Sequence, residues 1–272
     1  MSAEDIYTYE KKILIRSEQV DMTRRLRISE LFRLMEEASI AHTEELGCTR
    51  EKTLDRGLLW VITRQQAQIE ELPAYDEEII VRSWQGDMMH VFFPRFYEIE
   101  RAGKILVRGQ ALWILIDEEE REMIMPEEYG IEIPGRPGSD DMMLPAVVVP
   151  KEAECIIEKE LVTCFSQVDI NGHMNNTRYF DIIDDAMYSF CTGDAETGGL
   201  PEHGSMAAET AGRSEYGPMA ERKVPCVIRA NYLSELRVGD RFTLTGYRDE
   251  SGAVFYEGAD GDKIKFRIAC DF

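Results

Sequence analysis

Two stretches of this chain follow the same pattern at a constant distance of 148 positions, as from Gln19 to Gln167. The first begins with Gln-Val-Asp and leads into an apolar-periodic segment from Ile28 to Ala38. The second begins with the same three residues and leads into a similar segment from Asn176 to Ala186. Aligning them needs no gap. The sequence therefore predicts two similar structural units in one chain.

Each copy has the pattern of a strand, a long helix and several further strands. Apolar residues at helical spacing predict one helix from about Ile28 to Leu46, ended by Gly47, and another from Asn176 to about Phe190. Alternating or apolar runs predict strands at Tyr7–Ile15, Leu58–Ile69, Glu78–Trp84, Val91–Arg101, Lys104–Asp117, Cys155–Thr163, Val224–Leu233, Arg241–Tyr247, Val254–Gly258 and Lys263–Phe272.

The expected division of the chain follows from this pattern. One half spans residues 1–125, the other spans residues 151–272, and a linker with five prolines occupies residues 126–150. Residues 191–222 are rich in Gly, Glu, Ala and Ser and read as a long loop. A sheet wrapped around each helix would bury the apolar helix face, and joining the two sheets edge to edge would protect their edge strands.

Composition narrows the functional classes. Hydrophobic residues make up 44% and charged residues 31% of the chain, as in ordinary globular proteins. The formal net charge of −21 argues against nucleic acid as a partner. There is no run of eighteen apolar residues and no secretory leader, so no membrane span is expected and a cytoplasmic location is the default. The six cysteines form no CxxC pair, so neither a metal nor another cofactor is expected.

The second copy of the Gln-Val-Asp turn carries side chains suited to acid, base or hydrogen-bond chemistry: Asp169, Asn171 and His173. The first copy keeps Asp21 but has Thr23 and Arg25 at the two other positions. The turn therefore does not need an asparagine and a histidine in order to form. This difference favours a chemical role for the pair that only the second copy has.

The repeated order of elements resembles the hotdog fold, so the chain is predicted to be an α+β double hotdog. The motif Asp169-x-Asn171-x-His173-Met174-Asn175-Asn176 precedes a helix, and Asn231-Tyr232-Leu233-Ser234-Glu235 follows some sixty residues later. Together they resemble the acyl-ACP thioesterases of plants and bacteria. The resemblance covers nearly the whole chain.

This resemblance implies a substrate, a reaction and a site. The substrate is a fatty acyl chain held as a thioester on acyl carrier protein, and hydrolysis gives a free fatty acid and the carrier thiol. The family's catalytic positions fall on Asp169, Asn171, His173 and Glu235. Some plant members have a cysteine directly after the glutamate, where this chain has Leu236. A thiol nucleophile at that position is excluded, so a carboxylate and water must perform the reaction.

Thioester hydrolysis needs an attacking water, a group that takes its proton and donors for the developing oxyanion. Glu235 could orient and deprotonate the water, with His173 contacting the water or the leaving sulfur. Asp169 could hold a neighbouring side chain, and Asn171 could bind the water or a carboxylate. The N-terminus of the second helix is a further candidate site for the carbonyl oxygen. Which carboxylate is the base or nucleophile stays open.

Other functions fit the same residues. An acyl-CoA thioesterase would need basic residues for the phosphates of CoA, a hotdog dehydratase would act on a 3-hydroxyacyl group without water, and an acyl-binding protein would need no Asn-x-His turn. The acyl chain is expected to lie in the first half, along Ile28, Leu31, Phe32, Met35, Ile40, Leu59, Val61 and Ala67. A homodimer is a further expectation.

Overall fold

The structure is a computed structural model that describes residues 7–136, 144–192 and 224–272. The described residues form two α-helices, α1 (Ile28–Glu45) and α2 (Arg178–Thr192). The strands are β1 (Tyr9–Leu14), β2 (Leu58–Ile69), β3 (Glu78–Gln85), β4 (Phe93–Arg101), β5 (Lys104–Asp117), β6 (Glu154–Val162), β7 (Val227–Tyr232), β8 (Arg241–Arg248), β9 (Val254–Asp260) and β10 (Lys263–Asp271). Short 3₁₀ helices are η2 (Ser17–Gln19), η3 (Arg50–Lys52), η4 (Leu54–Arg56), η5 (Pro126–Tyr129) and η6 (Phe165–Gln167).

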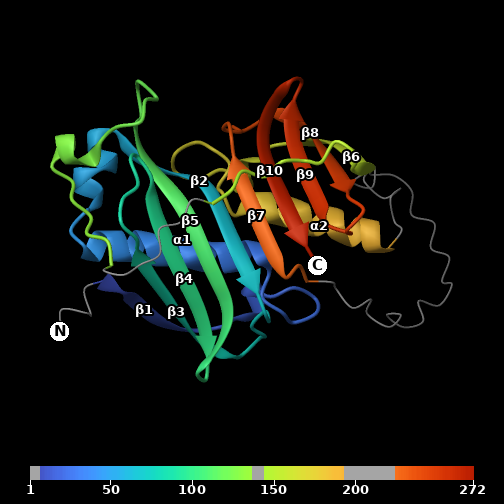
Figure 1. The fold of residues 1–272 in the computed structure, drawn as a ribbon, viewed down its shortest axis with the longest axis horizontal. Helices are drawn as coiled ribbons and strands as arrows, with labels where there is room; N and C mark the ends of the chain where they lie inside the picture. The colour runs from blue at the N-terminus through green and yellow to red at the C-terminus, as the bar shows by residue number, and fades with distance from the viewer. Residues whose placement is uncertain (1–6, 137–143, 193–223) are drawn as a thin grey trace, which may run out of the picture.

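The ten strands of the described residues form one sheet in the order β1-β3-β4-β5-β2-β7-β10-β9-β8-β6. Each neighbouring pair is antiparallel, and the two halves join where β2 pairs with β7, from Arg64 opposite Asn231 to Gln68 opposite Val227. Figure 1 shows α1 behind the strands of the first half and α2 behind those of the second half. This arrangement is a double hotdog, and the expected edge-to-edge joining of the sheets is confirmed.

Helix α1 forms because one face is apolar and the other carries compensating charges. Its residues Leu31, Phe32 and Met35 are buried, with at most 1% of each exposed. On the outer side, Arg33 forms ion pairs with Glu30 and Glu37, which are three and four positions away on the helix surface. The buried face fixes the helix against the concave side of the sheet.

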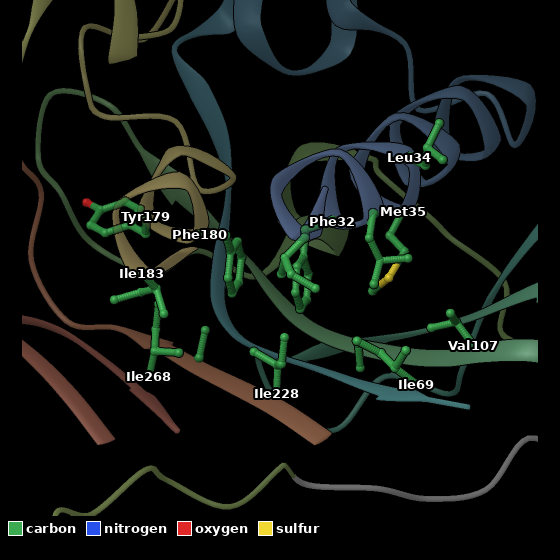
Figure 2. Close-up of a cluster of buried hydrophobic side chains, with 14 of the residues drawn as sticks. Phe32, Leu34, Met35, Ile69, Val107, Tyr179, Phe180, Ile183, Ile228 and Ile268 are labelled. Carbon is green, nitrogen blue, oxygen red and sulfur yellow. The ribbon is translucent and has the colours of Figure 1, made fainter. Parts of the chain in front are cut away.

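The cores of the two halves merge under the central strands. Phe32 of α1 and Phe180 of α2 stack with their ring centroids 3.9 Å apart and their planes tilted by 3°, and Figure 2 shows Ile228 of β7 beneath them. Their side chains belong to a single buried cluster that extends from Ile15 to Cys270. Burial of aromatic side chains contributes strongly to stability, so this contact helps to hold the halves in one arrangement.

The described parts of the proline-rich stretch 126–150 pack against the sheet. Ile131 is buried beside Leu58 and Leu115, and the backbone N–H of Val147 donates to the side-chain oxygen of Asn231 at 3.1 Å. These contacts tie the stretch to both halves.

Candidate active site

The duplicated turn has the same internal hydrogen bonds in both halves. In the first half, the Asp21 carboxylate accepts the backbone N–H of Thr23 at 2.8 Å. In the second half, the Asp169 carboxylate accepts the backbone N–H of Asn171 at the same distance. Aspartate side chains commonly stabilise turns in this way. Asp169 therefore shapes the turn, whatever else it does.

The second turn brings His173 to Glu235. The backbone N–H of Met174 donates to the carbonyl of Leu236 at 2.7 Å, which ties the turn to the loop after β7. As a result, His173 Nε2 lies 2.8 Å from Glu235 Oε2, with 17% and 33% of the two side chains exposed. The histidine and glutamate expected from the sequence thus form a directly bonded pair at the surface of the molecule.

The corresponding positions of the first half also hold a charged pair. Arg25 takes the place of His173, and its Nη1 lies 3.6 Å from the carboxylate of Glu71, the residue that aligns with Glu235. An arginine stays protonated and cannot act as a base near neutral pH. The duplicated fold therefore places a nitrogen-bearing side chain beside a carboxylate twice, and only the histidine of the second pair can exchange a proton near neutral pH.

Several cationic groups surround Glu235. The Arg121 guanidinium, from the turn after β5 in the first half, forms an ion pair with one carboxylate oxygen. Arg237 Nη2 lies 3.5 Å from the other oxygen, and Lys265 Nζ donates to the backbone carbonyl of Glu235 at 3.2 Å. The negative charge of this carboxylate is therefore balanced by arginines from both halves of the chain.

The surroundings of His173 favour its neutral form. Partial burial is the largest cause that lowers the pKa of this histidine below 6.5, followed by the positive charges of Arg237 and Arg121. The negative charges of Asp169 and Glu118 oppose the shift. A neutral imidazole can accept a proton, which a base must do.

Within the described part of the chain, the side chains of the other two predicted site residues form no hydrogen bond with this pair, although the backbone N–H of Asp169 donates to the His173 carbonyl at 2.9 Å. Asp169 acts on His173 through its charge, while its carboxylate holds the turn. Asn171 is exposed, and its side chain makes no hydrogen bond with another described residue. The amide of Asn171 is therefore available to a ligand.

The start of α2 differs from the sequence expectation. The helix begins at Arg178 rather than Asn176, because the side-chain oxygen of Asn175 accepts the backbone N–H of Thr177 at 3.0 Å and its hydroxyl at 2.6 Å. The N–H of Arg178 donates to the Asn175 carbonyl. These donors are already occupied, so they do not offer the expected site for a carbonyl oxygen.

Glu36 is a residue near the turn that the sequence reading missed. Burial raises its pKa to about 7, and the negative charge of Asp169 adds to the shift. One of its oxygens lies 3.5 Å from the side-chain nitrogen of Asn175, while the other is buried without a hydrogen-bond partner. Its position four residues after the buried Phe32 was the available signal, because a charge on an apolar helix stripe is unusual.

Replacing Glu36 with glutamine is expected to stabilise the protein more at pH 8 than at pH 5. The pKa of Glu36 is raised in the folded state, so folding is favoured while the group is protonated and this advantage is lost as pH rises from about 4.5 to about 7. The difference between the two pH values should be at most about 3 kcal/mol. Urea unfolding of both proteins measures it, with Glu45→Gln on the exposed end of α1 as control. An equal effect of Glu36→Gln at both pH values would contradict this prediction.

A cavity of about 230 Å³ lies in the first half, between α1 and the strands β2, β4 and β5. Its wall includes Trp60, Phe93 and Trp113, and Ile170 of the second turn reaches its rim. Its apolar character suits a hydrocarbon chain. The link through Ile170 places the cavity beside the turn that carries His173.

Part of the cavity wall is polar. Arg95 is 2% exposed, and it hydrogen-bonds to His42 Nδ1 and to the Thr43 hydroxyl, each at 2.7 Å. Burial lowers the pKa of Arg95 to about 10. The buried side-chain nitrogen of Gln85, also on the wall, has no hydrogen-bond partner. A hydrocarbon tail would gain little at this part of the wall.

Only one of the residues expected along the acyl chain lies on this wall. Ile40 does, whereas Phe32 and Met35 are buried in the shared core. Leu59 packs with Ile114 in a separate cluster. The cavity thus lies toward the C-terminal end of α1, whereas most of the helix residues expected along the acyl chain lie nearer its N-terminal end.

The described residues contain no group of three or more His, Cys, Asp or Glu side chains placed to hold a metal ion. None of their helices is both long and apolar enough to cross a membrane.

Comparison with known proteins matches each half of the chain to a family model. The model of the family described as "Acyl-ACP thioesterase N-terminal domain" matches residues 6–132, and that of the "Thioesterase-like superfamily" matches residues 164–264. The chain is thus similar to acyl-ACP thioesterases in its first half and to the wider thioesterase-like superfamily in its second half.

Curated acyl-ACP thioesterases resemble the chain at low identity. An acyl-[acyl-carrier-protein] hydrolase of Cuphea viscosissima is 26% identical over 191 residues, covering 65% of this chain and 46% of the relative. A dodecanoyl-[acyl-carrier-protein] hydrolase of Cinnamomum camphora is 26% identical over 193 residues, covering 64% and 50%. Both are named as chloroplastic proteins. The chain spans about half the length of the curated relatives it matches.

Solved acyl-ACP thioesterases share the whole fold. The structure from Bacteroides thetaiotaomicron has a TM-score of 0.71 and 18% identity, with 100% of both chains covered. The 12:0-ACP thioesterase from Umbellularia californica has a TM-score of 0.70 and 18% identity, covering 97% of this chain and 96% of that one. At this identity the likeness establishes the double hotdog fold alone.

Proposed function

We propose that this protein hydrolyses the thioester of fatty acyl-acyl carrier protein, giving a free fatty acid and the carrier thiol and so ending chain synthesis. The observation that carries the proposal is the bonded pair of His173, on a turn that borders an apolar cavity, and Glu235, on the loop after β7. The names of the curated relatives support the same reaction and the same carrier.

We propose that His173 is the general base. Because Nε2 faces the Glu235 carboxylate at 2.8 Å, the proton of the neutral ring is assigned to Nε2, which leaves Nδ1 to accept a proton from water. The water oxygen then attacks the thioester carbonyl carbon. The Glu235 carboxylate stabilises the imidazolium that forms, as a carboxylate does in a hydrolytic triad.

The developing negative charge needs donors in the same place. The Asn171 amide and the exposed Arg237 guanidinium are the donors beside the pair that we assign to this charge. When the carbon–sulfur bond breaks, the proton held by His173 passes to the leaving sulfur and releases the carrier thiol. Asp169 keeps the turn in shape during these steps.

We further propose a division of work between residues 1–125, which would hold the acyl chain, and residues 151–272, which would carry the base and its carboxylate. Residues 126–150 lie between them. The position of the cavity in the first half supports this division.

Release of thiol and fatty acid from purified acyl-acyl carrier protein tests the proposed activity. Acyl-CoA is the second substrate, and preference for it would replace the carrier in the proposal. Binding of the acyl chain without release would favour an acyl-binding protein, and loss of water from a 3-hydroxyacyl carrier would favour a dehydratase. His173→Ala, assayed in parallel, excludes a contaminating hydrolase.

The rate of hydrolysis is expected to rise with pH through the pKa of His173, which lies below 6.5. Protonation removes the base, so activity should fall on the acid side of this pKa and stay level through neutral pH. A pH profile of kcat/KM checks this. A rate that increased as pH fell from 6.5 to 5 would contradict a base role for His173.

Association with the carrier is expected to weaken as salt rises. Acyl carrier proteins are acidic and this chain carries −21, so docking needs a local basic strip. The candidates are Arg24, Arg25, Arg27, Arg178, Arg222 and Lys223, of which the last two lie outside the described residues. Arg25 and Arg178 already pair with Glu71 and Asp181. The affinity for acyl carrier protein, measured at several salt concentrations, tests this prediction. An affinity that rises steadily with salt would contradict docking on a basic strip.

A cytoplasmic location and a homodimer stay predictions. Cell fractionation tests the first and light scattering of the purified protein tests the second.

A further inference from the structure

Arg121 lies at a tightly built turn of the first half. The Asp117 carboxylate at the end of β5 accepts the backbone N–H groups of Glu119 and Glu120, each at 2.9 Å. The N–H of Arg121 donates to the Asp117 carbonyl at 3.0 Å. Arg121 itself has φ of 60°, in the left-handed region that non-glycine residues seldom adopt. The turn therefore holds one particular residue in a costly backbone conformation, a feature that occurs often at functional sites.

The side chain of Arg121 crosses to the second half. Its guanidinium pairs with Oε1 of Glu235, while Oε2 of the same carboxylate faces His173 at 2.8 Å. Each oxygen thus has its own partner, one from each half of the chain. Arg237, two positions after Glu235, approaches Oε2 at 3.5 Å with a side chain that is 65% exposed.

This arrangement has a chemical consequence for His173. A carboxylate whose only close partner is a histidine favours the protonated imidazolium, whereas a carboxylate shared with a guanidinium does so less. The charged groups that face His173 are Asp169 on its own turn, Glu235 and Arg237 on the loop after β7, and Glu118 and Arg121 on the turn after β5.

We propose that Arg121 is a positioning residue of the active site, supplied by the first half, which holds one oxygen of Glu235 so that the other stays directed at His173. The effect of Arg121 on catalysis rests on the proposed thioesterase function. The position of Arg121 beside Glu235 does not depend on that function. A purely structural role, in which Arg121 only links the two halves, is the competing explanation.

Hydrolysis by Arg121→Gln separates the two explanations through its pH dependence. Without the guanidinium, Glu235 pairs with His173 alone, the pKa of His173 rises and the acid limb of the profile moves to higher pH. We expect kcat/KM to fall by about tenfold at pH 6 but by about threefold at pH 8, mainly in kcat. Arg121→Lys keeps the positive charge, so the acid limb of its pH profile should lie close to that of the wild type. Arg108→Gln removes an exposed arginine of β5 and should change neither kcat/KM nor the position of the acid limb.

An NMR titration of the four histidines tests the placement without any substrate. The His173 signal, assigned with His173→Gln, should titrate at higher pH in Arg121→Gln than in the wild type or in Arg108→Gln. If the wild type hydrolyses no acyl thioester but this shift is seen, the proposed function fails and the placement of Arg121 stands. An unchanged His173 titration, or an equal loss of activity at all pH values, overturns the proposal. Should Arg121→Gln not fold, the same titration in Arg121→Met, which also removes the guanidinium, decides it, because an unchanged His173 titration there overturns the proposal.

Discussion

Replacing His173 with alanine is expected to lower kcat for acyl-acyl carrier protein hydrolysis by about two to four orders of magnitude, the contribution of a positioned general base. The imidazole is directly bonded to Glu235 and no other described histidine lies on this turn. Glu235→Ala and Asn171→Ala should each cost roughly a hundredfold, through loss of the carboxylate that orients the ring and of the exposed amide. Steady-state kinetics with a single acyl carrier substrate measures all three.

Thr23→Ala is the matched control, because Thr23 occupies the position of Asn171 in the first copy of the turn. Its rate should stay near the wild-type value, since the first turn faces Glu71 through an arginine that cannot act as a base. Full activity of His173→Ala would remove the pair from the mechanism. A large loss in Thr23→Ala would show that catalysis is not confined to the second turn.

Changing the size of the first-half cavity is expected to change the lengths of the fatty acids released. Trp60→Leu enlarges the cavity and should favour longer fatty acid products. Cys48→Leu fills part of the cavity and should favour shorter ones. Each buried methylene contributes about 0.8 kcal/mol, which corresponds to about fourfold in relative kcat/KM for each carbon. Mass spectrometry of the products formed from a mixture of acyl carriers gives the distribution.

Met35→Ala provides the contrast to these two variants. Met35 packs in the shared core, so closely that a side-chain carbon on Gly109 would lie 2.5 Å from its methyl group. Its truncation should lower stability by about 2–5 kcal/mol and leave the product lengths unchanged. If Met35→Ala moved the distribution and the cavity variants did not, the acyl chain would bind elsewhere.

The repeat and the apolar periodicities were sufficient to predict most of the fold. Strands β2 and β5 have the bounds that the alternating pattern indicated, and α1 ends at Glu45, one residue before the expected Leu46. The start of α2 was placed two residues too early, because the capping bonds of Asn175 depend on side-chain geometry and not on periodicity.

The site was predictable only where its residues are close in sequence or share a motif. His173 could be identified from the difference between the two turns, and Glu235 from the family resemblance. Arg121 and Glu36 reach the site from the other half, and no local pattern gives a distance across the join between β2 and β7. The cavity along α1 could not be located from the sequence, because periodicity identifies the buried face of a helix but not which part of that face borders empty space.

The pairing of β2 with β7 inside one chain has a consequence for how the two turns could diverge. Two identical chains joined by the same strands would carry the same residues in both turns, and any change in one would appear in the other. Covalent fusion removes this symmetry. Arg25 and Glu71 can keep a fixed ion pair in one turn while His173 and Glu235 exchange a proton in the other. Because both turns lie in one chain, one of them can carry the proposed chemistry while the other keeps a structural ion pair.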